Sequence, residues 1–514
     1  MVRTTFGRVK GQRQDGVAVF RGIRYGASTG GANRFKAPQD PKPWRGLFDA
    51  SRDGPQCPQP ASFGPATGAS ANLAAIFGAT EGDLESSEDC LRLNVFTPDC
   101  DKAARAVMVW IHGGFYTTGS GNGAMYAGSA LARNEDVVVV TVTHRLNVFG
   151  YLYLSASDGP DFGQTANAGQ LDLVQALKWV RDNIAGFGGD PDRVTVFGES
   201  GGGRKIDVLM GMPAAKGLFK RAIVQSGPGV TVSSSEYQTR LTDALLTALK
   251  IGRAEQLKLQ YAPVEALLAA HQSISDSALG RTVQPGYLMG GFTPVLDGDV
   301  IPAHPFAPAA SRLAADVELL IGTNRDEQGL FLLLDPEVRK GVDEAVLNSR
   351  VHRLLGSRAE AVLAAYRTHL PSATPEERLR AIETDRTYWI NSVRIAERKA
   401  AQRATVRMYQ FDWATSAFSG RLGAHHGLEL GFVFNNLSAT RTLVPDTPEN
   451  QLLANRMGRA WASFAKTGNP DQAGLPEWPA YEPESRRTMS INSQWSVVED
   501  PRAFARAIWS ELAP

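Results

Sequence analysis

The sequence is poor in cysteine and has no excess of charge of either sign. Its 514 residues contain three cysteines, and 54 lysines and arginines stand against 53 aspartates and glutamates. No long run of one sign is present, so the charge pattern indicates neither a nucleic-acid partner nor attraction to an anionic membrane. With 43% hydrophobic residues and 51 glycines, the chain belongs among globular proteins with a large buried core.

Long hydrophobic runs are also missing. No apolar segment approaches the ~18 residues that span a bilayer. Residues 1–16 are basic but lack the apolar region of a secretory signal peptide. We therefore expect no membrane partner and a cytoplasmic protein, with a secreted mature form as the alternative. Cys57 and Cys90 lie 33 positions apart and could remain thiols or close a loop, which leaves Cys100 single.

The chain has no internal repeat, low-complexity tract or long linker, so a single domain over residues 1–514 is the simplest organisation. Short β-branched runs predict buried strands, and residues 167–184 carry apolar side chains at helical spacing. The predicted strands cover residues 107–111, 137–142, 194–197, 222–225 and 317–321. This alternation predicts an α/β fold with a mostly parallel central sheet flanked by helices.

A helical insertion is expected roughly within residues 230–316 and 335–410. Ligands of α/β sheets bind at the carboxyl ends of the strands, so an insertion there would cover the active site. The loops that follow the strands are therefore where catalytic residues should be sought.

The segment 198–202 (GESGG) directly follows a predicted strand and has glycine on both sides of Ser200. This pattern is typical of a sharp strand-to-helix turn that exposes a nucleophilic serine. The alternatives are a glycine-rich turn with an incidental serine, or a phosphate-binding loop. The second fails because Arg204 stands where lysine is required and Lys205 is followed by an isoleucine.

A serine nucleophile also needs donors for an oxyanion, a base and an acid. Gly113, Gly114 and Phe115 follow the strand at 107–111, where this fold places one part of the oxyanion hole, and Gly201 would supply a further amide. The base candidates are adjacent in the loop 423–427 (GAHHG), and the acid candidates are adjacent in 322–329 (GTNRDEQG). Spacing alone does not choose between His425 and His426, nor between Asp326 and Glu327.

Two long segments, residues 187–202 (FGGDPDRVTVFGESGG) and 88–98 (EDCLRLNVFTP), resemble signatures of the type B carboxylesterase family. That family includes bacterial para-nitrobenzyl esterases, animal carboxylesterases and cholinesterases. Shorter matching segments follow in the family's order at residues 20–25, 145–150, 167–169, 292–298 and 461–470. The resemblance covers nearly the whole chain and implies the α/β-hydrolase fold.

Carried over to this sequence, the resemblance implies Ser200 as nucleophile, Glu327 as acid and His426 as base. Asp326 and His425 then become structural neighbours. The resemblance further implies that Glu199 and Ser226 support the acid and the base. It also implies a disulfide between Cys57 and Cys90, with Cys100 free.

The chain departs from the family pattern beside the oxyanion loop. Phe115 takes the place of a third glycine and narrows the approach to the serine, while Gly201 stands where many relatives have alanine. We expect the second difference to leave the chemistry unaffected.

We expect a serine hydrolase that cleaves small to medium carboxylic esters through an acyl-enzyme, without a metal or an organic cofactor. The alternatives are an amide, carbamate or lipid hydrolase of the same fold, and a non-catalytic scaffold protein. Residues 119–123 (GSGNG) do not indicate a dinucleotide-binding site, because the required order of strand, glycine turn and helix is missing there. The expected partner is a small-molecule ester, and the expected assembly is a monomer or a small homo-oligomer.

Overall fold

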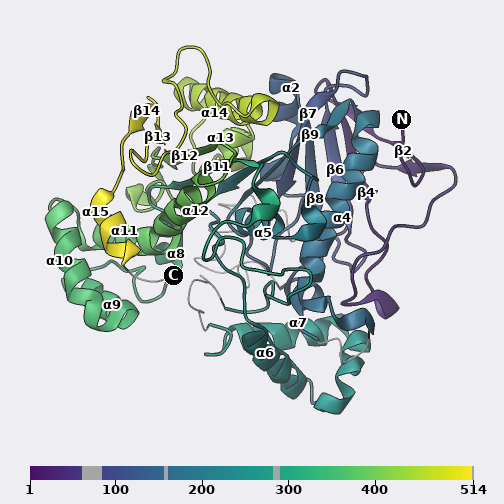
Figure 1. Cartoon of the computed structure of the whole chain (residues 1–514), viewed down its shortest axis with the longest axis horizontal. Coiled ribbons are helices and arrows are strands. Elements are labelled where there is room, and N and C mark those ends of the chain that lie inside the picture. Colours follow the sequence, from purple (N-terminus) through teal and green to yellow (C-terminus); the bar gives the residue numbers. More distant parts are fainter. Residues whose placement is uncertain (61–83, 155–159, 282–289, 512–514) are drawn as a thin grey trace.

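An 11-stranded sheet forms the centre of the fold (Figure 1). The structure is a computed structural model that describes residues 1–60, 84–154, 160–281 and 290–511. From one edge to the other, the strands are β14 (Ser496–Val498), β13 (Thr488–Ile491), β12 (Val406–Phe411), β11 (Glu318–Asn324), β10 (Arg221–Gln225), β9 (Gly189–Glu199), β7 (Arg105–Ile111), β8 (Val138–Thr143), β6 (Arg92–Thr97), β4 (Val17–Arg24) and β3 (Gln12–Gln14). A separate small sheet pairs β1 (Val2–Arg3), β2 (Arg8–Lys10) and β5 (Leu47–Asp49).

The strands from β13 to β8 all run parallel, and antiparallel strands are confined to the two edges. The predicted strands correspond to β7, β8, β9, β10 and β11, and the predicted crossover helix is α4 (Ala168–Asn183). The α/β-hydrolase expectation is thus confirmed: a mostly parallel sheet with helices on both faces. Buried parallel strands read as continuous apolar runs, which is why the sequence revealed them.

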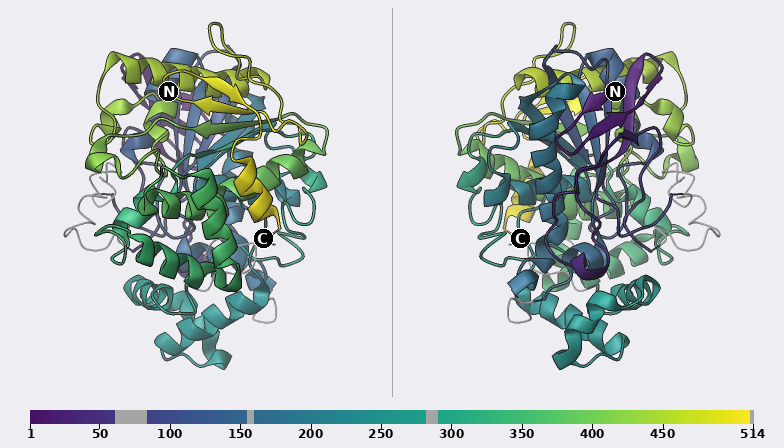
Figure 2. Two further views of the ribbon diagram at one scale, coloured as in Figure 1. Left: turned by 90° about the vertical axis from the view of Figure 1, so that its left-hand side faces the viewer. Right: turned by 90° about the vertical axis from the view of Figure 1, so that its right-hand side faces the viewer.

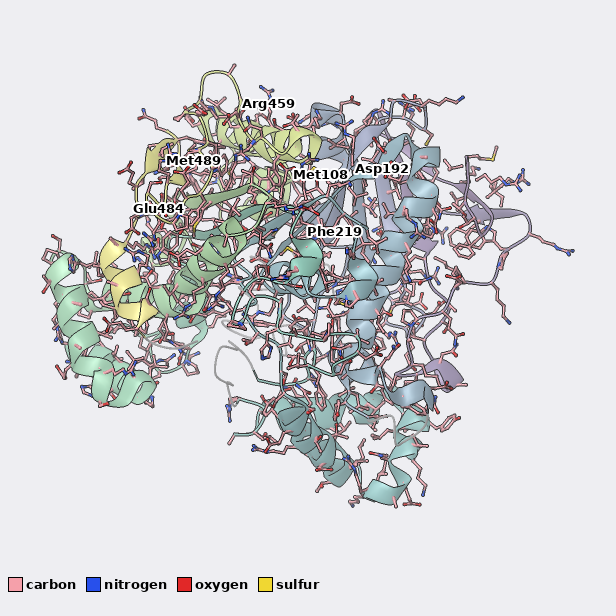
Figure 3. All side chains as sticks on the ribbon, viewed as in Figure 1. Met108, Asp192, Phe219, Arg459, Glu484 and Met489 are labelled. Carbon is pink, nitrogen blue, oxygen red and sulfur yellow. The ribbon has the colours of Figure 1, made fainter. Side chains whose placement is uncertain are left out.

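Two hydrophobic cores lie on opposite faces of this sheet, because successive side chains of a strand point to opposite sides. On β7, Val107 and Val109 belong to the core that also contains residues of α4, and Met108 and Trp110 belong to the other core. Helix α14 (Pro448–Thr467) covers the second core. In Figure 3 the labelled Met108 lies in the sheet and Arg459, from α14, lies at the edge of the molecule.

Helices fill the long connections between the late strands. Between β10 and β11 lie α6 (Ser235–Ala248) and α7 (Val264–Ser275). Between β11 and β12 lie α8 (Gln328–Leu334), α9 (Glu344–Leu355), α10 (Ala359–His369), α11 (Pro375–Thr384), a π-helix (Asp385–Trp389) and α12 (Ile390–Ala400). Figures 1 and 2 show α6 and α7 extending from one end of the molecule.

The remaining helices are short or lie near the chain end. They are α2 (Ser129–Glu135), α3 (Asn147–Tyr151), α5 (Gly201–Met210), α13 (Leu430–Val433) and α15 (Ala503–Ser510). Residues of α8 to α11 and α15 share a third, smaller apolar core. Across the described ranges, none of these helices combines the length and the apolar character needed to cross a membrane.

Candidate active site

Ser200 lies in the sharp turn that joins β9 to α5. Its backbone has φ 55° and ψ −123°, a strained conformation for a residue with a side chain. The flanking glycines permit the close packing of this turn against β7. A Cβ on Gly202 would lie 2.0 Å from the carbonyl oxygen of Ile111, and one on Gly198 would lie 2.6 Å from the same oxygen. The turn therefore has the geometry of a nucleophile held above the carboxyl edge of a sheet.

The loop after β7 packs directly against this turn. A Cβ on Gly113 would lie 3.4 Å from Cβ of Ser200, and a Cβ on Gly201 would lie 2.3 Å from the carbonyl oxygen of Phe115. Phe115 itself has φ 58°, a conformation that glycine adopts more readily. The structure thus brings the backbone of Gly113, Phe115 and Gly201 together beside the serine.

His426 and Glu327 form a direct, buried pair. Nδ1 of His426 lies 2.6 Å from Oε2 of Glu327, and Oε1 of Glu327 accepts a hydrogen bond from the amide of Asn324 at the end of β11. An ionised carboxylate only accepts, so Nδ1 carries the proton and Nε2 is left to accept another. This is the arrangement that a histidine base requires.

Glu199 faces the other nitrogen of the same imidazole. Its Oε1 lies 3.2 Å from Nε2 of His426, close enough for an ion pair. Neither atom makes a well-directed hydrogen bond to any described residue, so Nε2 is not bonded to Ser200 here. Hydrogen bonds of this kind often tighten only when substrate binds.

Burial raises the pKa of Glu199 to about 8, against the charge of His426, which lowers it. Burial alone would lower the pKa of His426, but the carboxylates of Glu199 and Glu327 outweigh it and raise that pKa to about 9. A proton on Glu199 removes one of these two charges. It therefore brings the pKa of His426 down, towards the range in which the imidazole can act as a base.

A cavity of about 170 Å³ opens beside the serine. Phe331 and Tyr388 line it together with Ser200, and the ring centroids of these two aromatic residues lie 5.2 and 5.1 Å from that of His426. Two aromatic walls of the cavity therefore pack against the ring of His426. The polar wall of the cavity includes Arg204, contributed by α5.

The rejected candidates for base and acid have other partners. Asp326 binds Nε of Arg380 at 3.0 Å and accepts the amide of Ala424 at 2.9 Å. Burial would raise the pKa of Asp326, but Arg380 and Arg325 hold it below its usual value. Nδ1 of His425 lies 2.8 Å from the carbonyl oxygen of His426, and burial lowers the pKa of His425 to about 4.

For Ser226, the supporting role that the resemblance implied stays a prediction. Its side chain lines the cavity beside Ser200, and Oγ has no hydrogen-bond partner in the described part of the chain. Another residue, Glu429, is bound into the network around the acid. It accepts hydrogen bonds from Gln225 at 3.0 Å and from Asn324 at 2.7 Å. No spacing rule pointed to Glu429, although it lies in the segment 426–434 (HGLELGFVF), which resembles the family's segment around the base.

The disulfide implied by the resemblance is absent from this structure. Cys57, Cys90 and Cys100 are free thiols. The first two are buried and interact through a hydrogen bond, which together with burial raises the pKa of Cys90 well above its usual value. Sγ of Cys57 also accepts the amide of Leu146 at 3.3 Å, so the thiol has a second polar contact.

Known proteins resemble this chain over nearly its whole length. The family model described as the carboxylesterase family matches residues 1–509. The chain belongs to the carboxylesterase family. It is 38% identical to the para-nitrobenzyl esterase of Bacillus subtilis (strain 168), over 98% of this chain and 97% of the relative. It is also 34% identical to the phenmedipham hydrolase of Pseudarthrobacter oxydans, over 97% of this chain and 96% of the relative.

Solved structures agree with this assignment. The carboxylesterase EST55 of Geobacillus stearothermophilus superimposes with a TM-score of 0.85 at 38% identity, covering 99% of both chains. A thermophilic para-nitrobenzyl esterase gives the same TM-score at 37% identity. The expectation of an enzyme is confirmed, and the carboxylesterase acts on carboxylic esters of small molecules.

Proposed function

We propose that this carboxylesterase works through an acyl-enzyme formed on Ser200. His426 takes the proton of the serine hydroxyl as Oγ attacks the ester carbonyl carbon, and then gives it to the departing alkoxide. Water, activated by the same imidazole, hydrolyses the acyl-enzyme and regenerates the serine. The observation that carries the proposal is the contact of 2.6 Å between Nδ1 of His426 and Glu327, which fixes the imidazole so that Nε2 is the nitrogen that accepts the proton.

Glu327 holds the imidazole in the required tautomer and stabilises its positive charge. The amides of Gly113, Gly114, Phe115 and Gly201 are the proposed donors to the oxyanion. Each such donor is worth about 3 to 4 kcal/mol of transition-state stabilisation. The close packing of the loop against Gly201 supports this proposal.

The cavity supports a preference for small acyl or alcohol groups. Its volume of about 170 Å³ is below the range of roughly 300–1,000 Å³ that is common for sites of drug-sized ligands. Phe115, Phe331 and Tyr388 give it apolar walls. We therefore propose short to medium esters as the best substrates.

The test is hydrolysis of para-nitrophenyl esters of increasing acyl length by wild type and Ser200→Ala. We expect the rate to peak on short chains and the variant to lose about 10⁶-fold in kcat. Ser235→Ala, an exposed serine on α6, is the matched control and should retain wild-type turnover.

An organophosphate should also label wild type at one site and leave Ser200→Ala unlabelled. Full ester turnover by Ser200→Ala, or labelling of that variant, would contradict the assignment of the nucleophile. Retained labelling of Ser235→Ala would show that the loss is specific to position 200.

A further inference from the structure

Lys205 is a fully buried lysine on α5, one turn after the nucleophile. Its ammonium donates a hydrogen bond of 3.1 Å to the carbonyl oxygen of His112 and lies 5.7 Å from the ring centroid of Tyr116. Both residues belong to the segment that follows β7. The lysine therefore lies behind the loop that packs against the serine.

The carbonyl of His112 and the amide of Gly113 belong to the same peptide unit. A cation that donates to the carbonyl oxygen withdraws electrons from the unit and makes its N–H a stronger donor. The same contact fixes the plane of the peptide, and hence the direction of the amide. Gly113 lies close to the nucleophile, since a Cβ on Gly113 would lie 3.4 Å from Cβ of Ser200. Its amide is one of the proposed donors to the oxyanion.

In the part of the chain that the structure describes, no carboxylate forms an ion pair with the ammonium of Lys205. His112 and His144 stack with ring centroids 4.8 Å apart, and burial lowers the pKa of both, so both rings are neutral. Glu199 is the acidic group whose charge acts on the lysine, and burial raises the pKa of that carboxyl. The hydroxyl-bearing ring of Tyr116 adds no charge at neutral pH.

A buried cation near the start of a helix is costly. Burial disfavours the charged form, and the positive end of the helix dipole adds to this cost. A methionine of similar volume would fill the same space more cheaply. The presence of a buried lysine at this point therefore favours a role in the reaction over a role in stability.

We propose that Lys205 is a positioning residue that orients and polarises the His112–Gly113 peptide so that the Gly113 amide stabilises the oxyanion. The inference rests on the proposed acyl-enzyme mechanism. It predicts that loss of the ammonium weakens an interaction made chiefly in the transition state. Such a loss lowers kcat and leaves KM largely unchanged.

The experiment compares Lys205→Met with wild type on one para-nitrophenyl ester between pH 6 and pH 9. We expect kcat at pH 6 to fall about tenfold, a fraction of the 10²–10³-fold effect of losing a whole donor. KM should stay within about twofold. Thermal stability should be unchanged or higher, because an apolar side chain replaces a buried charge.

The pH profile separates this role from a purely structural one. Burial lowers the pKa of Lys205 to about 7. The ammonium is therefore present at pH 6 and is lost as the pH rises through that value. The ratio of wild-type to variant kcat should be largest at pH 6 and should shrink towards pH 9. A ratio that does not change with pH would overturn the proposal.

Lys399→Met is the matched control. Lys399 is also buried and donates to a backbone carbonyl, that of Ala314 at 2.6 Å, but it lies on α12 and does not line the cavity. This variant should retain wild-type kcat at every pH. If Lys205→Met does not fold, Lys205→Gln tests the charge alone, because its neutral side chain can still donate a hydrogen bond; kcat at pH 6 should again fall more than at pH 9.

Organophosphate labelling distinguishes the two proposals. If wild type is not labelled at Ser200, the acyl-enzyme mechanism itself fails. If wild type is labelled and the folded Lys205 variant keeps kcat within twofold of wild type at pH 6, only the role of Lys205 is refuted.

Discussion

Replacement of Gly201 by alanine should lower the activity of this carboxylesterase strongly, although the family resemblance implies alanine at that position in many relatives. The extra Cβ would lie 2.3 Å from the carbonyl oxygen of Phe115 and 2.5 Å from its Cα. Both are backbone atoms, so the contact cannot be relieved by a side-chain rotation.

The size of the effect follows from the distances. Ordinary van der Waals contact of a Cβ begins at 3.4 Å, so the loop must withdraw by about 1 Å. A displacement of that size costs about 10²-fold in rate when it misplaces a catalytic group. Loss of a single oxyanion donor costs about 10² to 10³-fold. We expect kcat of Gly201→Ala to fall by about 10²-fold, although the amide at position 201 is retained.

The assay measures kcat and KM on a short para-nitrophenyl ester, together with the melting temperature. Gly252→Ala is the control, because its nearest neighbour to an added Cβ is Oε2 of Glu255 at 3.9 Å. Phe115→Gly should partly rescue Gly201→Ala. Phe115 has φ 58°, and glycine at that position lets the loop adopt another conformation at lower cost.

Two results would refute this reasoning. If Gly201→Ala keeps kcat within threefold of wild type with an unchanged melting temperature, the loop withdraws without effect on the oxyanion site. If the double variant is no more active than Gly201→Ala, the conformation of Phe115 does not hold the loop in place. A double-mutant cycle gives the coupling between the two positions directly.

Three further predictions concern the charges and thiols. Glu199→Gln removes a negative charge that raises the pKa of His426, so the rise of kcat/KM with pH should move to lower pH; an unmoved profile contradicts the coupling. Asp172→Asn leaves the buried Arg145 without its ion pair and should lower the free energy of unfolding by about 3–5 kcal/mol. The exposed control Asp243→Asn should change it by about 0.5 kcal/mol at most, and equal effects would contradict the argument. Thiol titration of the denatured chain should count three thiols, and a count of one would indicate the disulfide that the resemblance implied.

Sequence rules were sufficient where the structural requirement is local. The turn at Ser200 needs glycine two positions on either side because β7 leaves no room for a Cβ, and that requirement appears as a short pattern after an apolar strand. The parallel strands could be predicted from the sequence equally well, because burial on both faces makes them continuous apolar runs.

The choice between the two adjacent acids, and between the two adjacent histidines, does not depend on the local sequence. Asp326 and Glu327 differ in function because one lies beside Arg380 and the other beside His426, and both partners are distant in sequence. Only the family resemblance favoured Glu327 before the fold was known. The supporting role of Ser226 also rests on the resemblance alone and stays a prediction.

On helix α5, the phosphate-loop interpretation fails, but two residues of that segment still contribute to the site. Arg204 and Lys205 argued against a phosphate-binding loop because they stand in the wrong register. In the fold, the first lines the cavity and the second donates to the carbonyl that precedes Gly113. Neither position follows from a spacing rule, because each depends on which loop packs against the helix. Both are charged side chains whose burial is costly, on a helix that begins at the nucleophile. We therefore expect substitutions at these two positions to alter the chemistry of this carboxylesterase.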